Sequence, residues 1–154
     1  MIIKIKHSSI ITNKQTELIN ITQDVQDFIK STLIANGVVF IISMHTTTGM
    51  IVNESIPDLE SDIASFYEKI VPEDLIYHHS RFLAFDGQMG INATSHIRST
   101  LMGFEIYFPI EDGKIQKGSR QNIYFVELDG PQERTFIIQV IGEKKYKIKK
   151  EVIR

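Results

Sequence analysis

The sequence contains no cysteine and no tryptophan among its 154 residues. Without cysteine the chain can form neither a disulfide nor a zinc–thiolate site, and it has no thiolate nucleophile. No apolar run approaches the roughly 20 residues that a membrane-spanning helix requires. The N-terminus lacks the apolar core and the cleavage site of a signal peptide. We therefore expect a cytoplasmic protein with no membrane partner.

An excess of positive charge is also missing. The chain carries 17 basic and 19 acidic side chains, a formal net charge of -2, so we expect no nucleic-acid partner. Positive charge gathers in residues 144–154. This basic segment is either a phosphate- or nucleic-acid-binding tail or an edge strand at residues 146–149 whose lysines discourage aggregation. The alternation of apolar and basic residues favours the edge strand.

The composition is typical of a globular domain, with 42% hydrophobic and 23% charged residues. Apolar alternation or continuous apolar runs predict strands at residues 2–11, 16–21, 38–42, 49–53, 104–110, 123–128 and 135–141. Three helices are predicted: one capped by Thr22 and ending near residues 36–37, one from Pro57 to about residue 70 with Ile63 in the core, and one capped by Asn92 and ending near Gly103. Residues 73–91 are expected to form a long surface loop. We therefore expect a single α+β domain over residues 1–154, with mostly antiparallel packed sheets and about three helices.

Three histidines stand in polar or small-residue surroundings in three separate segments: His45, His79 and His96. Neutral imidazole is the commonest side-chain metal ligand, and three of them together could hold a metal with one position open. His78 and His79 are adjacent, so in an extended chain only one of them can face a given site. Alternatively, each histidine is a surface residue or bonds to neighbouring hydroxyls. A metal site therefore requires that the fold bring these three side chains together.

Other polar residues stand near these histidines. The threonines and the glycine that follow His45 could offer hydroxyl and N–H groups to a phosphate. His96 lies in the first turns of a predicted helix, where unpaired N–H groups bind anions, and Arg98 could add a bidentate phosphate contact. Glu54 follows an apolar strand and is the stronger candidate acid or base. Asp62 is a second candidate, with a solvated or capping charge as the alternative.

Several motifs occur in order along the chain: HTTTG at residues 45–49, NESIPDLESDI at 53–63, YHH at 77–79, NATSHIRSTLMG at 92–103, PIEDG at 109–113, GSRQ at 118–121, DGP at 129–131 and QVIGE at 139–143. Together they resemble the YjbQ-type family of small proteins, also called the secondary thiamine-phosphate synthase family. The resemblance extends from about the first predicted helix to Gly142. The family usually has Gly-Thr-Trp-Gln where this chain has GSRQ, so Arg120 stands in place of an aromatic residue.

The resemblance implies an α+β fold and a homotrimer with sites near the subunit interfaces. It implies the joining of a pyrimidine pyrophosphate to a thiazole phosphate with loss of pyrophosphate, an activity considered secondary in the family. The implied catalytic residues are His45, Glu54, Asp62 and His96; the implied substrate-binding residues are Thr47, Asn53, Asn92, Arg98 and Arg120. His45, His79 and His96 are the implied ligands of a divalent metal, either zinc or, with a pyrophosphate substrate, magnesium.

Three functions are therefore open. The first is a transferase acting on a phosphorylated small molecule, in which a metal, Arg98 and a helix N-terminus stabilise the leaving pyrophosphate. Glu54 or a free histidine would serve there as general base or position the substrate. The second is a metal-assisted hydrolase of a small phosphate or ester. The third is a non-catalytic trimeric binding protein in which the histidines are structural.

Overall fold

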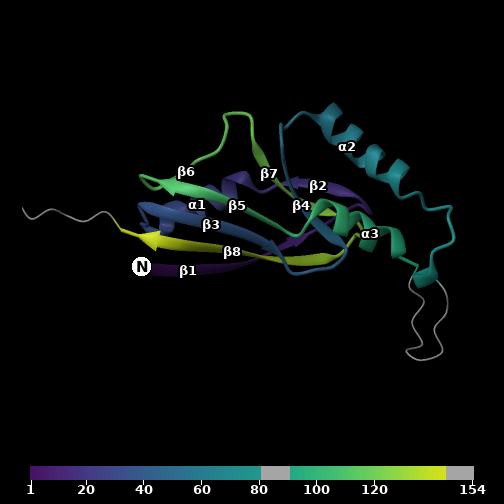
Figure 1. Cartoon of the computed structure of the whole chain (residues 1–154), viewed down its shortest axis with the longest axis horizontal. Helices are drawn as coiled ribbons and strands as arrows, with labels where there is room; N and C mark the ends of the chain where they lie inside the picture. Colours follow the sequence, from purple (N-terminus) through teal and green to yellow (C-terminus); the bar gives the residue numbers. More distant parts are fainter. Residues whose placement is uncertain (81–90, 145–154) are drawn as a thin grey trace, which may run out of the picture.

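The computed structural model describes residues 1–80 and 91–144 and shows two antiparallel β-sheets packed against each other (Figure 1). The larger sheet has five strands in the order β1-β8-β3-β5-β6, and the smaller has three in the order β2-β7-β4. Their bounds are β1 Ile2–Ile11, β2 Glu17–Asn20, β3 Asn36–Ser43, β4 Thr48–Asn53, β5 Glu105–Glu111, β6 Lys114–Ile115, β7 Asn122–Glu127 and β8 Glu133–Glu143. The expected α+β class with packed antiparallel sheets is confirmed.

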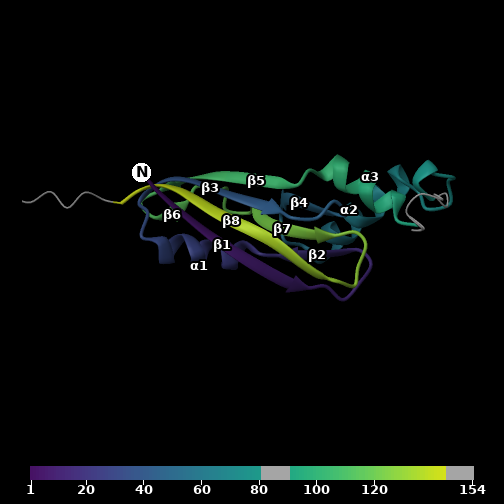
Figure 2. The ribbon, with the colours of Figure 1, turned by 90° about the horizontal axis from the view of Figure 1, so that it is seen from below.

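The described residues contain three α-helices and one short 3-10 turn. These are α1 (Thr22–Thr32), α2 (Pro57–Ile70), α3 (Ala93–Met102) and η1 (His78–Ser80). Figure 2 shows α1 against one face of the five-stranded sheet. Helix α3 lies past the end of the strands that is far from α1. In residues 1–80 and 91–144, no helix is both long enough and apolar enough to cross a bilayer. The expected number of helices is confirmed.

The main hydrophobic core lies between the two sheets and beneath α1. It combines apolar side chains of α1, of the inward faces of β3, β5 and β8, and of β4 and β7: Val25, Ile29, Val39, Ile41, Met50, Phe108, Ile123, Phe125, Phe136, Ile138 and Val140. Across the interface between the sheets, the rings of Phe125 and Phe136 lie with their centroids 5.8 Å apart. This core fixes the ends of β3 and β4. The predicted site residues His45 and Thr47 lie between these strands, and Asn53 and Glu54 lie at the C-terminal end of β4.

Two helix boundaries and one predicted side-chain cap differ from the prediction. Helix α1 ends at Thr32, before the predicted Asn36–Gly37 stop, because Leu33 takes a left-handed φ of 57° and turns the chain toward β3. Thr22 is the first helical residue, and the Oδ1 of Asn20 accepts hydrogen bonds from its N–H and its hydroxyl. Asn92 does occupy the N-cap position of α3, but its side chain bonds elsewhere. Local propensity therefore located the helices, while tertiary contacts set their ends.

Two regions of the sequence prediction lie partly or wholly outside the described residues. Of the predicted loop at residues 73–91, residues 81–90 are outside, and the part before them forms η1. The basic segment is described at Lys144 alone, so the predicted edge strand at residues 146–149 also lies outside.

The short strand β6, which pairs with β5 after the turn at Asp112 and Gly113, was not predicted.

The outer face of the five-stranded sheet, opposite α1, is mostly apolar. We call it the outer sheet face. It presents Ile3 and Ile5 of β1, Ile137, Gln139 and Ile141 of β8, Val38, Phe40 and Ile42 of β3, and Tyr107 and Pro109 of β5. These residues are exposed or half-buried, and Tyr107 is 68% exposed. An antiparallel sheet that faces water on one side normally alternates apolar and polar residues. The outer sheet face is instead mostly apolar, with His7 opposite Ile137, Glu105 opposite Ile42 and Gln139 as polar residues on it.

Helix α2 stands away from the core. Its predicted apolar face exists, but in the described chain none of its residues is buried, and Phe66 is 58% exposed. The expectation that Ile63 belongs to the core is wrong. Helix α2 lies over the edge of the smaller sheet, so Ile63 packs only beside β4 and stays half-buried. The helix therefore leaves an open apolar surface beside β4.

Candidate functional site

All the predicted site residues except Asn92 and Arg98 fall into three groups within one chain. His45 and Thr47 lie in the connection between β3 and β4. His79 and His96 lie together on η1 and α3. Asn53, Glu54, Asp62 and Arg120 surround the N-terminal part of α2 and the end of β4. No three histidine, aspartate or glutamate side chains of residues 1–80 and 91–144 come together as a group that could hold a metal ion.

His45 is held by the backbone of β8. Its Nε2 accepts a hydrogen bond from the N–H of Thr135 at 2.9 Å and lies 3.1 Å from the Thr135 Oγ1. Because Nε2 is an acceptor, the proton of the neutral ring sits on Nδ1. Burial lowers the pKa of His45, the nearby Arg134 guanidinium lowers it further, and the Glu127 carboxylate partly opposes them. The geometry therefore favours a neutral imidazole with Nδ1–H free to donate.

A cavity of about 640 Å³ opens beside His45. Its walls come from the end of β3, the following connection and the second half of α3: Ser43, Met44, His45, Thr46, Ser99, Thr100, Gly103 and Phe104. Helix α3 can lie this close to β4 because Gly49 has no side chain; a Cβ there would come within 2.8 Å of Met102. The Oγ of Ser99 donates to the carbonyl oxygen of Thr48 at 2.6 Å and fixes the approach.

His79 and His96 form the one close histidine pair of the described chain. Their ring centroids are 5.2 Å apart and their planes are perpendicular, at 89°. They line a cavity of about 480 Å³ together with Tyr77, His78, Ala93 and Ile97. Two imidazoles at this separation can each offer a nitrogen to one ion, given metal–nitrogen distances of about 2.0–2.1 Å for zinc. His78 also lines this cavity, because residues 78–80 form the 3-10 turn η1 and not the extended chain in which only one of the two histidines could face a site.

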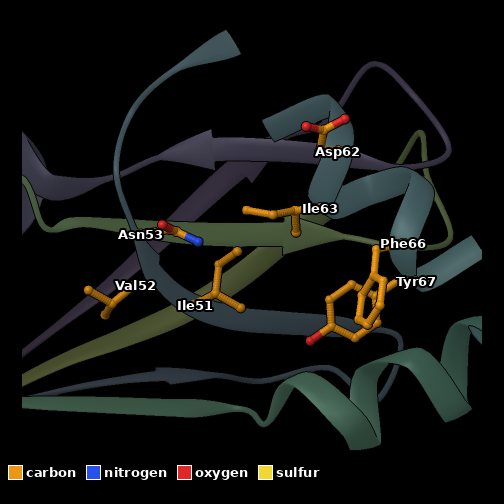
Figure 3. Close-up of a pocket in the computed structure, with 7 residues that line it drawn as sticks. All are labelled: Ile51, Val52, Asn53, Asp62, Ile63, Phe66 and Tyr67. Atoms are coloured by element: carbon orange, nitrogen blue, oxygen red, sulfur yellow. The ribbon is translucent and has the colours of Figure 1, made fainter. Parts of the chain in front are cut away.

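The acidic group borders a groove of about 540 Å³ between α2 and β4. It is lined by Ile51, Val52, Asn53, Asp62, Ile63, Phe66 and Tyr67, and Figure 3 shows Ile63 directed from α2 toward Ile51. Glu54 follows β4, and its Oε1 accepts a hydrogen bond from the Nη1 of Arg120 at 2.9 Å. The Arg120 side chain is 80% exposed. The groove is thus mostly apolar, with Asn53 and Asp62 as its polar groups.

Arg98 serves the fold in this structure. Its side chain is 2% exposed, and both Nε and Nη2 donate to the carbonyl oxygen of Val71, at 3.2 and 2.7 Å. Nη1 lies 3.5 Å from the Glu73 carboxylate. Arg98 therefore holds the C-terminal end of α2, and a phosphate could reach its guanidinium only by displacing these partners. Asn92 is similarly engaged, because its Nδ2 donates to the Asp129 carboxylate at 2.7 Å.

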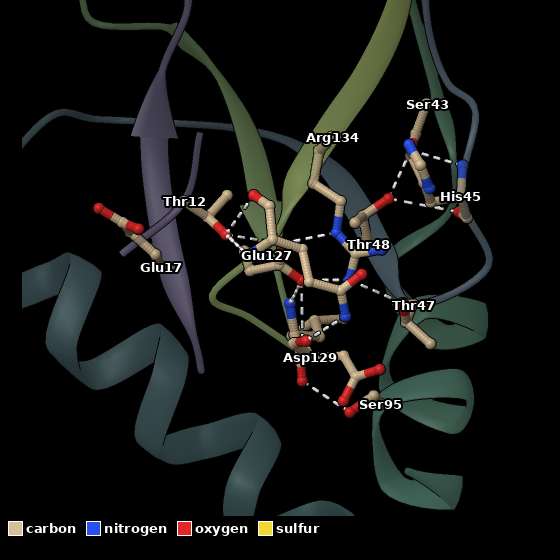
Figure 4. Close-up of polar contacts among 12 residues, drawn as sticks. Thr12, Glu17, Ser43, His45, Thr47, Thr48, Ser95, Glu127, Asp129 and Arg134 are labelled. Carbon is tan, nitrogen blue, oxygen red and sulfur yellow. Dashed lines mark hydrogen bonds and ion pairs between the residues drawn. The ribbon is translucent and has the colours of Figure 1, made fainter. Parts of the chain in front are cut away.

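A buried ion pair was missed by sequence reasoning. Arg134 donates from Nε and Nη2 to the two carboxylate oxygens of Glu127, at 2.6 and 2.7 Å (Figure 4). Their side chains are 5% and 0% exposed. Burial alone would raise the pKa of Glu127, but hydrogen bonds from Arg134, the Asp129 N–H and Thr12 outweigh it, so its pKa lies below the ordinary value. One signal was present: Arg134 shares the inward face of β8 with Phe136 and Ile138.

Comparison with known proteins gives consistent matches. A family described as "UPF0047 protein YjbQ-like" matches residues 6–143 of this chain. A UPF0047 protein of Methanothermobacter thermautotrophicus is 38% identical over 132 residues, which cover 86% of this chain and 87% of that protein. A UPF0047 protein of Archaeoglobus fulgidus is 36% identical over 130 residues, covering 84% and 95%.

The fold also has solved counterparts. A crystal structure from Sulfolobus solfataricus, described as a YbjQ-like protein of unknown function, superposes with a TM-score of 0.84. It shares 31% sequence identity, and the match covers 92% of this chain and 98% of the other. All the predicted site residues lie within residues 6–143, the segment that the family matches.

Proposed function

This chain belongs to the UPF0047 YjbQ-like family, and on that premise we propose that it is a transferase with thiamine-phosphate synthase activity. It would join a pyrimidine pyrophosphate to a thiazole phosphate. In this reaction the lone pair of the thiazole nitrogen forms a new bond to the carbon that carries the pyrophosphate, and the bond from that carbon to oxygen breaks. Pyrophosphate leaves with the bonding electrons. Charge stabilisation of this leaving group is the main requirement of the step.

The observation that supports the proposal best is the paired His79 and His96 at a cavity beside the N-terminal half of α3. Imidazole nitrogens suit zinc, and a pair supplies two of the ligands that a catalytic site uses. A bound divalent metal would supply Lewis-acid stabilisation of the leaving pyrophosphate. The N-terminus of α3, which precedes His96, adds N–H groups that favour negative charge.

The remaining residues would bind and orient the organic substrates. The groove between α2 and β4 has the size of a small-molecule site and offers apolar walls to a ring. Asn53 and Asp62 could hydrogen-bond to such a ring. Glu54, held by Arg120, would orient the substrate, because the thiazole nitrogen attacks through its lone pair and carries no proton for a base to remove. His45 would donate a hydrogen bond from Nδ1 to a substrate, since its Nε2 accepts the N–H of Thr135 and leaves no nitrogen lone pair for a metal.

We further propose that the chain assembles as a homotrimer. The outer sheet face and the apolar side of α2 support self-association, since apolar surfaces of this extent are typical of interaction sites. Assembly would also bring the groups that are separate in one chain next to groups of a neighbouring copy. The cytoplasm is the proposed location, and cell fractionation followed by immunoblotting tests it.

An assay of thiamine phosphate formation tests the reaction. Purified protein is incubated with the pyrimidine pyrophosphate and the thiazole phosphate, with zinc or magnesium, and the product is separated by chromatography. We expect product with the wild-type protein, and a loss of at least about 100-fold in the rate for His96→Ala and Glu54→Gln, since a substrate misplaced by about 1 Å costs on the order of 100-fold. Lys30→Ala, on the exposed side of α1, is the control and should keep full activity.

Other outcomes separate the alternatives. Release of pyrophosphate without the thiazole phosphate would indicate a hydrolase, which a histidine-bound metal with an activated water would also support. Substrate binding measured by calorimetry without any turnover, under both metals, would indicate a binding protein. Either result would overturn the proposed transferase.

A further inference from the structure

The Glu127–Arg134 ion pair occupies the junction between two parts of the candidate site. Buried ion pairs are weak stabilisers, because the cost of desolvating two charges can exceed their attraction, and apolar replacements are often as stable. Here both carboxylate oxygens and two guanidinium nitrogens are engaged. Thr12 adds a hydroxyl donor to the same carboxylate at 3.0 Å. Both carboxylate oxygens and two of the three guanidinium nitrogens are thus hydrogen-bonded, so the pair meets the requirement for burial, and its bonds also reach the surrounding segments.

Arg134 and its neighbour in β8 hold the connection that carries His45. The Nη2 of Arg134, besides its bond to Glu127, donates to the Oγ1 of Thr47 at 3.0 Å. The next residue, Thr135, donates its N–H to the Nε2 of His45. Two consecutive residues of β8 therefore bind two side chains of one short connection. The orientation of the His45 ring depends on where this part of β8 lies.

Glu127 holds the opposite end of the junction. Its Oε1 accepts the N–H groups of Leu128 and Asp129 at 3.0 and 2.9 Å and shapes the turn after β7. The residues of this turn also form hydrogen bonds with the beginning of α3. The Oγ of Ser95 donates to the carbonyl oxygen of Leu128 at 2.6 Å, and the Asp129 carboxylate accepts the Asn92 amide. Helix α3 carries His96 directly after Ser95.

We propose that Glu127 and Arg134 are positioning residues, which set the His45–Thr47 connection relative to the N-terminus of α3 and so fix the relative placement of His45 and His96. The catalytic consequence rests on the proposed function, whereas the placement itself does not. Figure 4 shows the pair between the two parts, with Thr47 and His45 on one side and Asp129 and Ser95 on the other. The pair acts through these neighbours and does not itself contact substrate.

The decisive variant replaces both members of the pair, Glu127→Met with Arg134→Met. It leaves no unpaired buried charge, so it should fold cooperatively. It removes the bonds to Thr47 and to the turn after β7. The readout is the scalar coupling between the nitrogen of Thr135 and Nε2 of His45, measured by NMR on nitrogen-15-labelled protein. We expect this coupling in the wild type and its loss in the double variant.

Activity gives the second readout. A misplacement of about 1 Å costs on the order of 100-fold in rate, so the folded double variant should lose at least that much turnover with its thermal transition intact. Asp27→Asn with Lys30→Met is the matched control, since it removes an exposed ion pair of α1 with a 3.3 Å separation. The control should keep both the coupling and the rate.

Arg134→Lys covers the case in which the double variant does not fold. Lysine keeps the charge beside Glu127 but lacks the planar fork that reaches Thr47 as well. A weakened coupling in this variant supports positioning. A folded variant that retains the full coupling would overturn the proposal. If the wild type makes no thiamine phosphate, the proposed function fails, and the coupling still decides whether the pair positions His45.

Discussion

The imidazole rings of His79 and His96 stand perpendicular, with their centroids 5.2 Å apart, although one belongs to η1 and the other to α3. The contact links the 3-10 turn η1 to the first half of α3, which is the next helix along the described chain. His45, in contrast, lies against β8 with its Nε2 hydrogen-bonded to backbone. The three histidines that looked equivalent in the sequence therefore have different surroundings.

We expect zinc to bind with the participation of His79 and His96. Replacing His96 by alanine removes a ligand and should weaken zinc binding at least about tenfold, since loss of even an outer contact of a metal ligand costs 10–100-fold. Isothermal titration calorimetry on metal-free protein measures the affinity. His7→Gln, a substitution on β1, is the control. Equal zinc affinity in the wild type and the His96 variant would contradict the prediction.

The outer sheet face should mediate self-association. Light scattering on the eluted protein is expected to give three times the chain mass of 17.7 kDa. Phe40 and Tyr107 lie side by side on this face with ring centroids 6.3 Å apart, so a charge at Phe40→Glu should dissociate the assembly. Leu33→Asn removes a 70% exposed apolar side chain next to α1 and should leave the mass unchanged. A wild-type monomer at all concentrations would refute the assembly.

Acid should destabilise the protein through Glu127. Its pKa in the folded chain lies below the ordinary value of 4.5, so as pH falls the unfolded state takes up the proton first. The contribution of Glu127 is therefore complete above pH 4.5 and is lost as pH falls through the lower folded value. Glu127→Gln should cost about 3–5 kcal/mol in the free energy of unfolding at pH 7.

Urea denaturation over a pH series tests this linkage. The difference in unfolding free energy between wild type and Glu127→Gln should shrink as pH decreases below 4.5, because the protonated wild type comes to resemble the variant. A constant difference across the series would show that the pair does not depend on the charge of Glu127.

His45 should titrate below pH 6.5, its ordinary value. Burial disfavours the charged ring, and the positive charge of Arg134 adds to this effect. Below pH 6.5 the unfolded chain protonates first, so His45 makes folding less favourable as pH falls toward its folded pKa. Carbon-13 NMR of labelled histidine gives the midpoint directly. A midpoint at or above 6.5 would contradict the observed surroundings.

Arg98 should matter for the attachment of α2. Arg98→Met keeps an unbranched apolar side chain but removes both hydrogen bonds to Val71. Hydrogen bonds from charged groups contribute about 1.5–3 kcal/mol, so amides of residues 57–71 should exchange faster with solvent. Exchange in β3 and β8 should be unchanged. If the variant alters substrate binding with normal exchange in α2, Arg98 is a substrate ligand as the sequence suggested.

The sequence was sufficient for most strands and for all three helices, since their apolar periodicity is set by local burial. The order of the strands was not accessible, because β3 pairs with β5 and β8, both far away in the chain. The position of Ile63 was misjudged because a helix can bury its apolar face against a partner as well as against its own core. Periodicity does not distinguish these two cases.

The candidate site shows the same division. Residue types indicated that His79 and His96 were worth attention, but their proximity depends on how α3 docks. Arg98 was interpreted as a phosphate ligand from its place near a helix start, whereas its guanidinium is used by Val71. Glu127 and Arg134 flank an ordinary turn motif in the sequence. Only the packing of two sheets makes their charges a buried pair.

The serine hydroxyls of α3 have a consequence for the direction in which His96 faces. Ser95 and Ser99 share one side of the helix, and each donates to a main-chain carbonyl oxygen at 2.6 Å. An α-helix turns by about 100° per residue, so rolling α3 by one position would break both bonds at once. Apolar packing alone would permit α3 to rotate about its axis over a range of angles. Two directional hydrogen bonds restrict it to one angle. The hydroxyl bonds of Ser95 and Ser99 therefore determine the direction in which His96 leaves the helix, although neither hydroxyl bonds to the His96 ring.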